Sequence, residues 1–188
     1  MDSSEELIAS ARSGDDDAFR LLFEQHHRFI LRFLYGMVGE HDLAEELTQE
    51  SFARAFRSLK TLRNEAKFST WLCGIAKNVA YNGLRSRRRE VYTSSVSEPS
   101  IEEISGHNLS PDSQMLNAEL RSVIHTALGK LDEDKRLVFT LKVLQQQSYA
   151  EIAAATGFSI PKLKTDLHRA KDEMRRLIRA YLETSDEM

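Results

Sequence analysis

Hydrophobic residues recur along the first half of this chain at steps of three and four, the spacing that gathers them on one face of an α-helix. Polar or glycine-containing segments interrupt the pattern. It predicts four helices, over about residues 3–14, 15–36, 42–59 and 67–90. No valine- and isoleucine-rich alternating segment indicates a β-strand, and none of the three prolines lies inside a long periodic run. The first half is therefore expected to form a four-helix bundle.

A second helical unit is expected in the last third of the chain. Residues 91–110 are rich in Ser and Glu and have no apolar face, so they are predicted to be a flexible acidic linker. Ser110 and Pro111 then supply a helix cap and a proline at the first helical position. The following pattern predicts helices near residues 111–131, 132–146, 149–156 and 160–181. The expected fold is all-α, with two small helical domains over residues 1–90 and 111–188 joined by the linker.

The last two predicted helices have the features of a helix-turn-helix. Ser148 and Glu151 form an S-x-x-E capping box at the start of the first one. Gly157 lies where that helix must end with a positive φ, and Ser159 can cap the next helix. Basic and polar side chains lie opposite the apolar stripe of the final helix: Lys164, Thr165, His168, Arg169 and Arg176. A core helix with a solvated face is the alternative, but the combination favours a helix that enters a DNA groove.

Residues 67–90 also form a strongly basic amphipathic pattern. Its apolar face contains Phe68, Trp71, Leu72, Ile75, Ala76 and Val79, and its polar side contains Thr70, Lys77, Asn78, Tyr81, Arg85 and Arg88. Such a mixture of cations, aromatic rings and amides can hold phosphates and contact an unpaired base, although basic helix ends are often merely solvated. Trp71 lies in the apolar stripe, so we expect it in the core, and we expect Cys73 to be a buried small residue.

Charge is segregated along the chain, although the net charge is only −3. Residues 1–50 hold 12 acidic and 4 basic residues, whereas residues 60–90 hold 8 basic and 2 acidic residues. Residues 162–179 hold 7 basic and 3 acidic residues. Because phosphate neutralisation is local, the two basic segments indicate nucleic-acid binding. The acidic N-terminal third requires a different partner, and a protein fits best.

Other classes of protein have little support in the sequence. No apolar run is long enough to cross a bilayer, and the acidic N-terminus does not resemble a signal peptide, so a cytoplasmic protein with no direct membrane contact is expected. The single cysteine excludes an internal disulfide. No phosphate loop, metal-spaced cluster or nucleophile motif occurs, and His26 and His27 point in different directions on a helix. The chain is therefore expected to have no enzymatic activity, no cofactor and no metal.

Three segments, in this order, resemble the extracytoplasmic-function (ECF) sigma factors, group 4 of the sigma-70 family. Residues 42–56 (DLAEELTQESFARAF) resemble the region 2 helix that binds the polymerase. Residues 67–89 (KFSTWLCGIAKNVAYNGLRSRRR) resemble the stretch that melts and reads the −10 element, and residues 131–171 resemble region 4, which reads the −35 element. The resemblance covers almost the whole chain. It implies an alternative sigma factor that binds core RNA polymerase, at the β′ clamp helices and the β flap, directs promoter-specific initiation and is controlled by an anti-sigma factor.

The resemblance also implies site residues. Polymerase contacts are expected at Asp42, Glu45, Glu46, Gln49 and Glu50. Contacts with −10 DNA are expected at Lys60, Arg63 and Lys67, around a pocket for a flipped base, and at Lys77, Asn78, Arg85, Arg88 and Arg89. Contacts with −35 DNA are expected at Lys162, Lys164, Thr165, His168 and Arg169.

One departure from the family pattern concerns the start of the last helix. Where the family often has Gly-Thr-Val-Lys-Ser-Arg, this chain has Pro161-Lys162-Leu163-Lys164-Thr165-Asp166. An aspartate facing DNA would repel phosphate, so we expect Asp166 to pair with Lys162 or Arg169 instead. This leaves the −35 sequence preference open.

Two further questions stay open at the level of sequence. A conventional helix-turn-helix regulator with an N-terminal helical interaction domain is the alternative function, and it predicts a dimer and a palindromic DNA site. For the free protein, two arrangements stay open: the two domains lie apart, or the molecule closes through contact of the acidic first helices with the basic surface of residues 60–90, as the opposite charges suggest.

Overall fold

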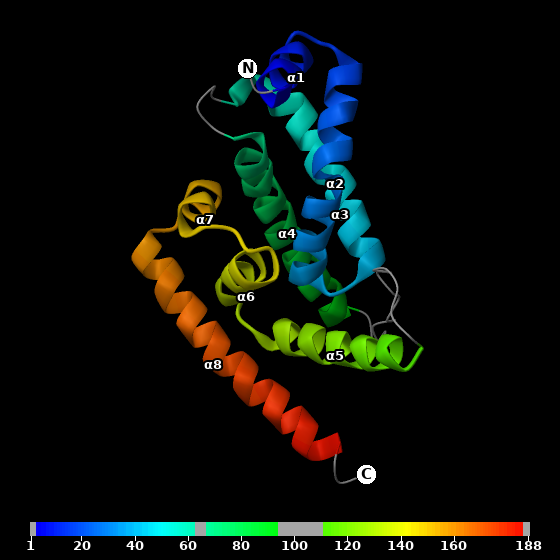
Figure 1. Ribbon diagram of the computed structural model, residues 1–188, viewed down its shortest axis with the longest axis vertical. Helices are drawn as coiled ribbons and strands as arrows, with labels where there is room; N and C mark the ends of the chain where they lie inside the picture. Colours follow the sequence, from blue (N-terminus) through cyan, green and yellow to red (C-terminus); the bar gives the residue numbers. More distant parts are fainter. Residues whose placement is uncertain (1–2, 63–66, 94–110, 186–188) are drawn as a thin grey trace.

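The structure of the protein, a computed structural model, describes residues 3–62, 67–93 and 111–185. Its regular elements in these ranges are all helical (Figure 1). They are α1 (Ser3–Arg12), α2 (Asp16–Val38), α3 (His41–Ser58), the short 3₁₀ turn η1 (Leu59–Thr61), α4 (Phe68–Thr93), α5 (Pro111–Lys130), α6 (Glu133–Phe139), the π-helical turn η2 (Thr140–Leu144), α7 (Tyr149–Thr156) and α8 (Ile160–Ser185). The all-α prediction is confirmed.

Local signals in the sequence account for several helix ends. The side chain of Asp15 caps α2 by accepting a hydrogen bond from the amide of Ala18 at 3.1 Å, and Gly39 ends the helix with a φ of 76°. α4 continues to Thr93, past the expected end at residue 90. Thus the predicted linker overlaps the last residues of α4, and residues 94–110 lie outside the described part of the chain.

The first four helices pack around a continuous apolar core. Leu22, Ile30, Phe33 and Leu34 from α2 are fully buried, and α3 and α4 cover them. Phe56 of α3 departs from this arrangement, because it is 48% exposed. Its ring lies against the edge of Phe19, with the ring centroids 4.9 Å apart, at the rim of the core.

The helix expected over residues 132–146 is interrupted. α6 ends at Phe139, the chain widens into the π-helical turn η2, and Gln146 has a φ of 56°. Thr140, at the start of this turn, is fully buried against Gly36 of α2. The Gln145 side chain donates a hydrogen bond to the backbone oxygen of Phe29 at 3.1 Å. These contacts stabilise the widened turn. The sequence did not predict it, because no glycine or proline occurs in residues 139–146.

The two expected helical units are present, and they pack against each other. Buried residues of both units belong to one hydrophobic cluster. α7 lies beside the first half of α4, and α5 and α6 contact α2, whereas the far end of α8 projects away from the rest of the molecule (Figure 1). A Cβ atom at Gly74 of α4 would lie 2.8 Å from the backbone oxygen of Ala155 in α7. This approach of α4 and α7 therefore requires a residue without a side chain.

The closed arrangement differs from the one suggested by charge alone. The acidic helix α1 packs on α2, whereas α4 packs against α7, and Tyr81 of α4 reaches Asp134 of α6. Acidic partners for α4 come from the second unit, at Asp134 and Glu151. From the first unit, Glu40 forms an ion pair with Arg87 of α4.

Candidate nucleic-acid interface

The predicted helix-turn-helix has the expected local geometry. The side chain of Ser148 accepts a hydrogen bond from the amide of Glu151 at 3.2 Å, and Glu151 accepts one from the amide of Ser148 at 3.0 Å, which completes the capping box. Gly157 ends α7 with a φ of 76°. The apolar stripe of α8 consists of buried side chains: Leu163, Leu167, Ala170 and Met174. The polar face of α8 therefore points away from the core.

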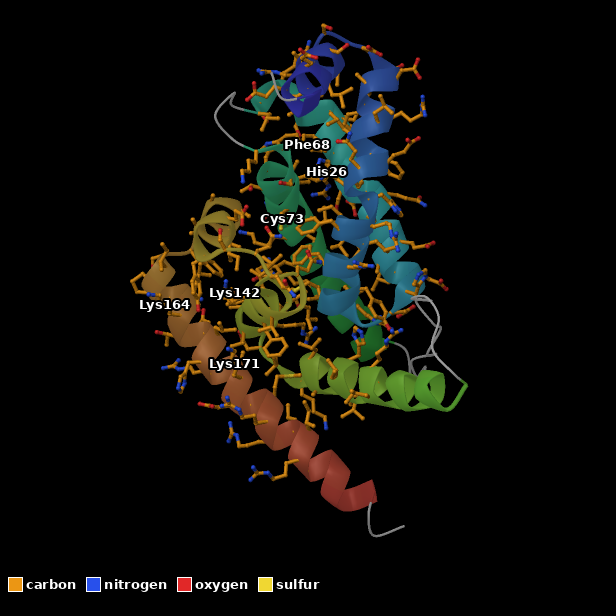
Figure 2. The ribbon with its side chains drawn as sticks, viewed as in Figure 1. His26, Phe68, Cys73, Lys142, Lys164 and Lys171 are labelled. Carbon is orange, nitrogen blue, oxygen red and sulfur yellow. The ribbon has the colours of Figure 1, made fainter. Side chains whose placement is uncertain are left out.

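Four of the five residues predicted to contact −35 DNA lie on that outer face. Lys164, Thr165, His168 and Arg169 are all exposed. The hydroxyl of Thr165 donates to the backbone oxygen of Pro161 at 3.0 Å, and Nδ1 of His168 lies 3.1 Å from a carboxylate oxygen of Asp172. Figure 2 shows Lys164 near the start of α8 and Lys171 further along it. The arrangement presents cations and hydrogen-bond donors along the N-terminal half of a helix, which suits a major groove.

The fifth residue, Lys162, has protein partners. Its Nζ lies 2.8 Å from Oδ2 of Asp134, forms a second ion pair with Asp166, and sits 4.2 Å from the ring centroid of Phe158. Burial tends to lower the pKa of Lys162, but the hydrogen bonds that it donates to the two carboxylates outweigh burial and raise that pKa. The expected pairing of Asp166 is thus confirmed, with Lys162 as the partner. Asp166 does not face outward, since its side chain is only 13% exposed.

The polar surface of α4 is partly covered by the second helical unit. Nζ of Lys77 donates to the backbone oxygen of Thr156 at 2.9 Å, and Nζ of Lys67 lies 3.4 Å from a carboxylate oxygen of Glu151. The hydroxyl of Tyr81 donates to Asp134 at 2.8 Å. Burial, followed by this hydrogen bond, raises the pKa of Tyr81, so the phenol remains a donor.

The other residues predicted to contact −10 DNA divide into two groups. Lys60, Asn78 and Arg85 are exposed. Arg63 lies outside the described residues, and for Arg88 and Arg89 only the helical backbone is described.

The residues predicted to bind the polymerase lie together on α3. Asp42, Glu45, Glu46 and Gln49 are exposed, and Glu50 is half-buried beside Arg54 at 2.5 Å. Three of them line a groove of about 560 Å³ between α3 and α4, and none of its other lining residues was predicted from the sequence. The lining residues are Glu40, Asp42, Leu43, Glu46, Leu47, Glu50, Asn82, Gly83, Ser86 and Arg87. The groove combines an acidic wall with an apolar floor, which suits a basic amphipathic helix.

Cys73 belongs to the core, and His26 is a partly buried histidine beside Phe68. Cys73 is buried, and burial raises the pKa of its thiol to about 12, so it is not a reactive cysteine. His26 packs on the ring of Phe68, with centroids 5.1 Å apart, and burial lowers its pKa (Figure 2). Within the described residues, no cluster of three or more His, Cys, Asp or Glu could hold a metal ion. None of the helices in this part of the chain is long and apolar enough to cross a membrane.

These features define a class of protein: a two-part DNA-binding protein with a helix-turn-helix, a second basic helix and an acidic face on α3. Residues 22–90 match the family described as Sigma-70 region 2, and residues 121–174 match Sigma-70, region 4. The chain is similar to the RNA polymerase sigma-H factor of Pseudomonas aeruginosa, with 30% identity over 97% of each chain. It is also similar to the ECF RNA polymerase sigma-E factor of Escherichia coli, with 32% identity over 88% of this chain and 89% of that protein.

Solved structures agree with this family. The structure of CnrH in complex with the cytosolic domain of CnrY has a TM-score of 0.71 and 23% identity, and the match covers 95% of this chain and 99% of that one; it supports the fold. The sigma factor RpoE from Bartonella quintana, in complex with the anti-sigma factor NepR, has a TM-score of 0.69 and 25% identity over 86% of this chain and 96% of that one. This chain belongs to the ECF sigma factors of the sigma-70 family. It is an alternative sigma factor, which directs core RNA polymerase to promoters.

Proposed function

We propose that this sigma factor reads its promoter with two helices, α4 at the −10 element and α8 at the −35 element. The observation that carries this assignment is that both helices combine a buried apolar stripe with a basic polar face, in the segments that match regions 2 and 4. Region 2 would occupy residues 1–90 and region 4 residues 111–188, with residues 91–110 as the tether.

Within α8, Lys164 and Arg169 supply positive charge, and Thr165 and His168 supply hydrogen-bonding groups for base edges. Lys162 would join them once DNA displaces its carboxylate partners. Within region 2, Asn78 would contact a −10 base, and cations of the loop and of α4 would hold phosphate: Lys60, Arg63, Lys67, Lys77, Arg85, Arg88 and Arg89. Phosphate contacts would fix the position of each helix while a few side chains read sequence. Capture of an extruded base would offset part of the cost of strand separation.

The acidic face of α3 supports a role in polymerase binding. Asp42, Glu45, Glu46, Gln49 and Glu50 would contact the β′ clamp helices, and region 4 would contact the β flap. The groove between α3 and α4 places exposed carboxylates beside apolar Leu43 and Leu47, so a basic helix could bury its apolar side there while its cations meet the acids.

The partner that controls this protein is proposed to be an anti-sigma factor. The related sigma factor RpoE was solved with the anti-sigma factor NepR, and the match covers most of both chains. We further propose that the protein acts in the cytoplasm, where the polymerase works, and contributes binding and not catalysis.

Charge reversal on α3 tests the polymerase assignment. Glu46→Lys places a cation in the acidic groove, and Glu5→Lys on α1 is a matched control because Glu5 is exposed and α1 contacts η1, beyond the far end of α3. Glu46→Lys should weaken binding to core RNA polymerase roughly tenfold, about 1.4 kcal/mol, whereas Glu5→Lys should leave it unchanged. Equal affinity of both variants, measured by fluorescence anisotropy, would overturn the assignment of the groove.

The conventional regulator remains the competing function, and the same preparations test it. It predicts a dimer that binds a palindromic duplex tightly without polymerase. The sigma factor account predicts weak, salt-sensitive DNA binding by the protein alone.

A further inference from the structure

The surface of α4 that the proposed function assigns to −10 DNA is already in contact with region 4. Lys77 donates to the backbone oxygen of Thr156 at 2.9 Å and lies 5.6 Å from the ring centroid of Phe158. Lys67 pairs with Glu151 at 3.4 Å. The oxygen atoms that these two cations contact therefore belong to the helix-turn-helix.

Asp134 connects the two DNA-reading helices. Its Oδ1 accepts the hydrogen bond of Tyr81 on α4 at 2.8 Å, and its Oδ2 accepts that of Lys162 on α8 at 2.8 Å. Burial of Asp134 favours its neutral form, but the hydrogen bonds from Lys162 and Tyr81 outweigh burial and lower its pKa. One carboxylate on α6 therefore engages a side chain from each reading helix at the same time.

The contact between the two regions is close enough to be specific. At Gly74 a Cβ atom would lie 2.8 Å from the backbone oxygen of Ala155, and at Gly36 one would lie 2.6 Å from Cγ2 of Thr140. Real Cβ atoms essentially never approach this closely. Because Gly36 and Gly74 have no side chains, atoms of region 4 can lie directly against these two region 2 helices. A nonspecific contact between tethered domains would not need glycine at these two positions.

We propose that the free protein is a closed, self-inhibited sigma factor in which α6 and α7 compete with promoter DNA for the surface of α4. The inference rests on the proposed assignment of α4 to the −10 element. Asp134, Glu151 and the Thr156 carbonyl stand in for DNA phosphates, and DNA gains access only when region 4 leaves α4. The apparent affinity for DNA is then the intrinsic affinity multiplied by the fraction of open molecules.

Gly74→Ala should disrupt the contact between the two regions while leaving the fold of each region intact. The added methyl group meets a backbone oxygen of α7, so the closed contact must shift, while alanine in the middle of α4 favours that helix itself. Gly129→Ala is the matched control, because Gly129 also lies in a helix and a Cβ there has no atom within 4 Å.

Two measurements on the full chain report whether region 4 separates from α4. Energy transfer between dyes on cysteines introduced at Ala53 of α3 and Lys171 of α8, both exposed, reports the separation of the regions. Buried Cys73 stays in place. Binding of a short, randomised, fluorescein-labelled single-stranded DNA reports access to α4. Gly74→Ala should lower the energy transfer and raise the DNA affinity roughly tenfold, as expected for an overpacking cost of about 1.4 kcal/mol on the closed state. Gly129→Ala should behave as the unmodified chain.

Two results would overturn the inference. Unchanged energy transfer in Gly74→Ala would show that this contact does not hold the regions together. Lower energy transfer without a gain in DNA affinity would show that region 4 does not obstruct α4. Asp134→Asn is a second test of the closed state, and it adds no atoms to the contact between α4 and α7. It should also lower the energy transfer and raise the DNA affinity. Asp17→Asn controls for the loss of one negative charge. Failure of the proposed function itself would appear separately, as absence of binding to core RNA polymerase by every variant.

Discussion

Replacement of Arg136 by methionine should destabilise the protein strongly. Arg136 lies on α6 and is only 7% exposed. Its guanidinium donates to the backbone oxygen of Met37 at 2.6 Å, of Gly129 at 2.6 Å and of Leu131 at 3.1 Å. Met37 lies in the last turn of α2, and Gly129 and Leu131 lie at the end of α5, where helix carbonyls lack partners within the helix. The side chain thus joins three segments and complements two negative helix ends.

The magnitude follows from these contacts. A hydrogen bond to a charged group contributes about 1.5–3 kcal/mol, and the three bonds share one donor group, so their contributions do not add fully. Methionine retains much of the length of the side chain but leaves carbonyl oxygens buried without this donor. We expect Arg136→Met to lower the free energy of unfolding by about 3–5 kcal/mol. Lys135→Met is the control: its half-exposed ion pair with Glu173, at 2.7 Å, should contribute about 1 kcal/mol or less.

Urea unfolding followed by circular dichroism measures both variants. In a chain of this length, each kcal/mol shifts the melting temperature by roughly 2–4 °C, so Arg136→Met should melt roughly 6–20 °C lower. If Arg136→Met proved as stable as Lys135→Met, the buried guanidinium would not hold α2, α5 and α6 together, and the reasoning would be refuted.

Three further predictions concern single residues. Ser148→Ala removes the helix cap of α7 and should cost about 1 kcal/mol of stability in thermal unfolding, with Ser13→Ala as a surface control; equal melting temperatures would contradict a role for the capping box. The thiol of Cys73, whose pKa burial raises to about 12, should react with an aromatic disulfide reagent only after unfolding, and fast reaction of the folded protein would contradict its burial. Burial lowers the pKa of His26 below its ordinary value of 6.5, so the unfolded chain binds the proton more readily; the stability contribution is complete above about pH 6.5 and declines as the pH falls toward the lower, folded-state pKa. His26→Gln should reduce this decline, and an unchanged pH dependence would exclude His26 as its source.

Local features of the chain could be predicted from the sequence. The capping box at Ser148 and the left-handed Gly157 are signals within a few residues, and the structure has both. The pairing of Asp166 with Lys162 was also predictable, because residues four apart on a helix are neighbours. In these cases the partners are close in sequence, so spacing alone brings them together.

Contacts between distant segments could not be predicted in this way. Lys77 was correctly placed on the polar side of α4, but its partner Thr156 is 79 residues away. Asp134 looked like an ordinary acidic residue in the first turn of a helix, and only the packing of α6 against α4 brings it to Tyr81, 53 residues away. Charge alone suggested acidic partners for α4 from the first helices. Glu40 does pair with Arg87, but Asp134 and Glu151 come from the second unit, and the close contact at Gly74 that brings this unit to α4 depends on the fit between helices and not on net charge.

The residues proposed to contact −35 DNA on α8 differ in how exposed their side chains are. Lys164, Thr165, His168 and Arg169 are available to DNA without rearrangement of the helix, whereas Lys162 must first leave Asp134 and Asp166. If Lys162 contacts DNA as proposed, the −35 preference would depend on the energy of that ion-pair network as well as on the bases.

Transcription from a genomic promoter library, by core RNA polymerase with this protein added, tests the central claim most directly. The account predicts that initiation depends on the protein and that the start sites share a −10 and a −35 element. Substitution of Asn78 should alter the preference only at the first element, and substitution of Arg169 only at the second. Absence of core binding, together with tight binding of a dimer to a palindromic duplex, would contradict the account and support a conventional regulator.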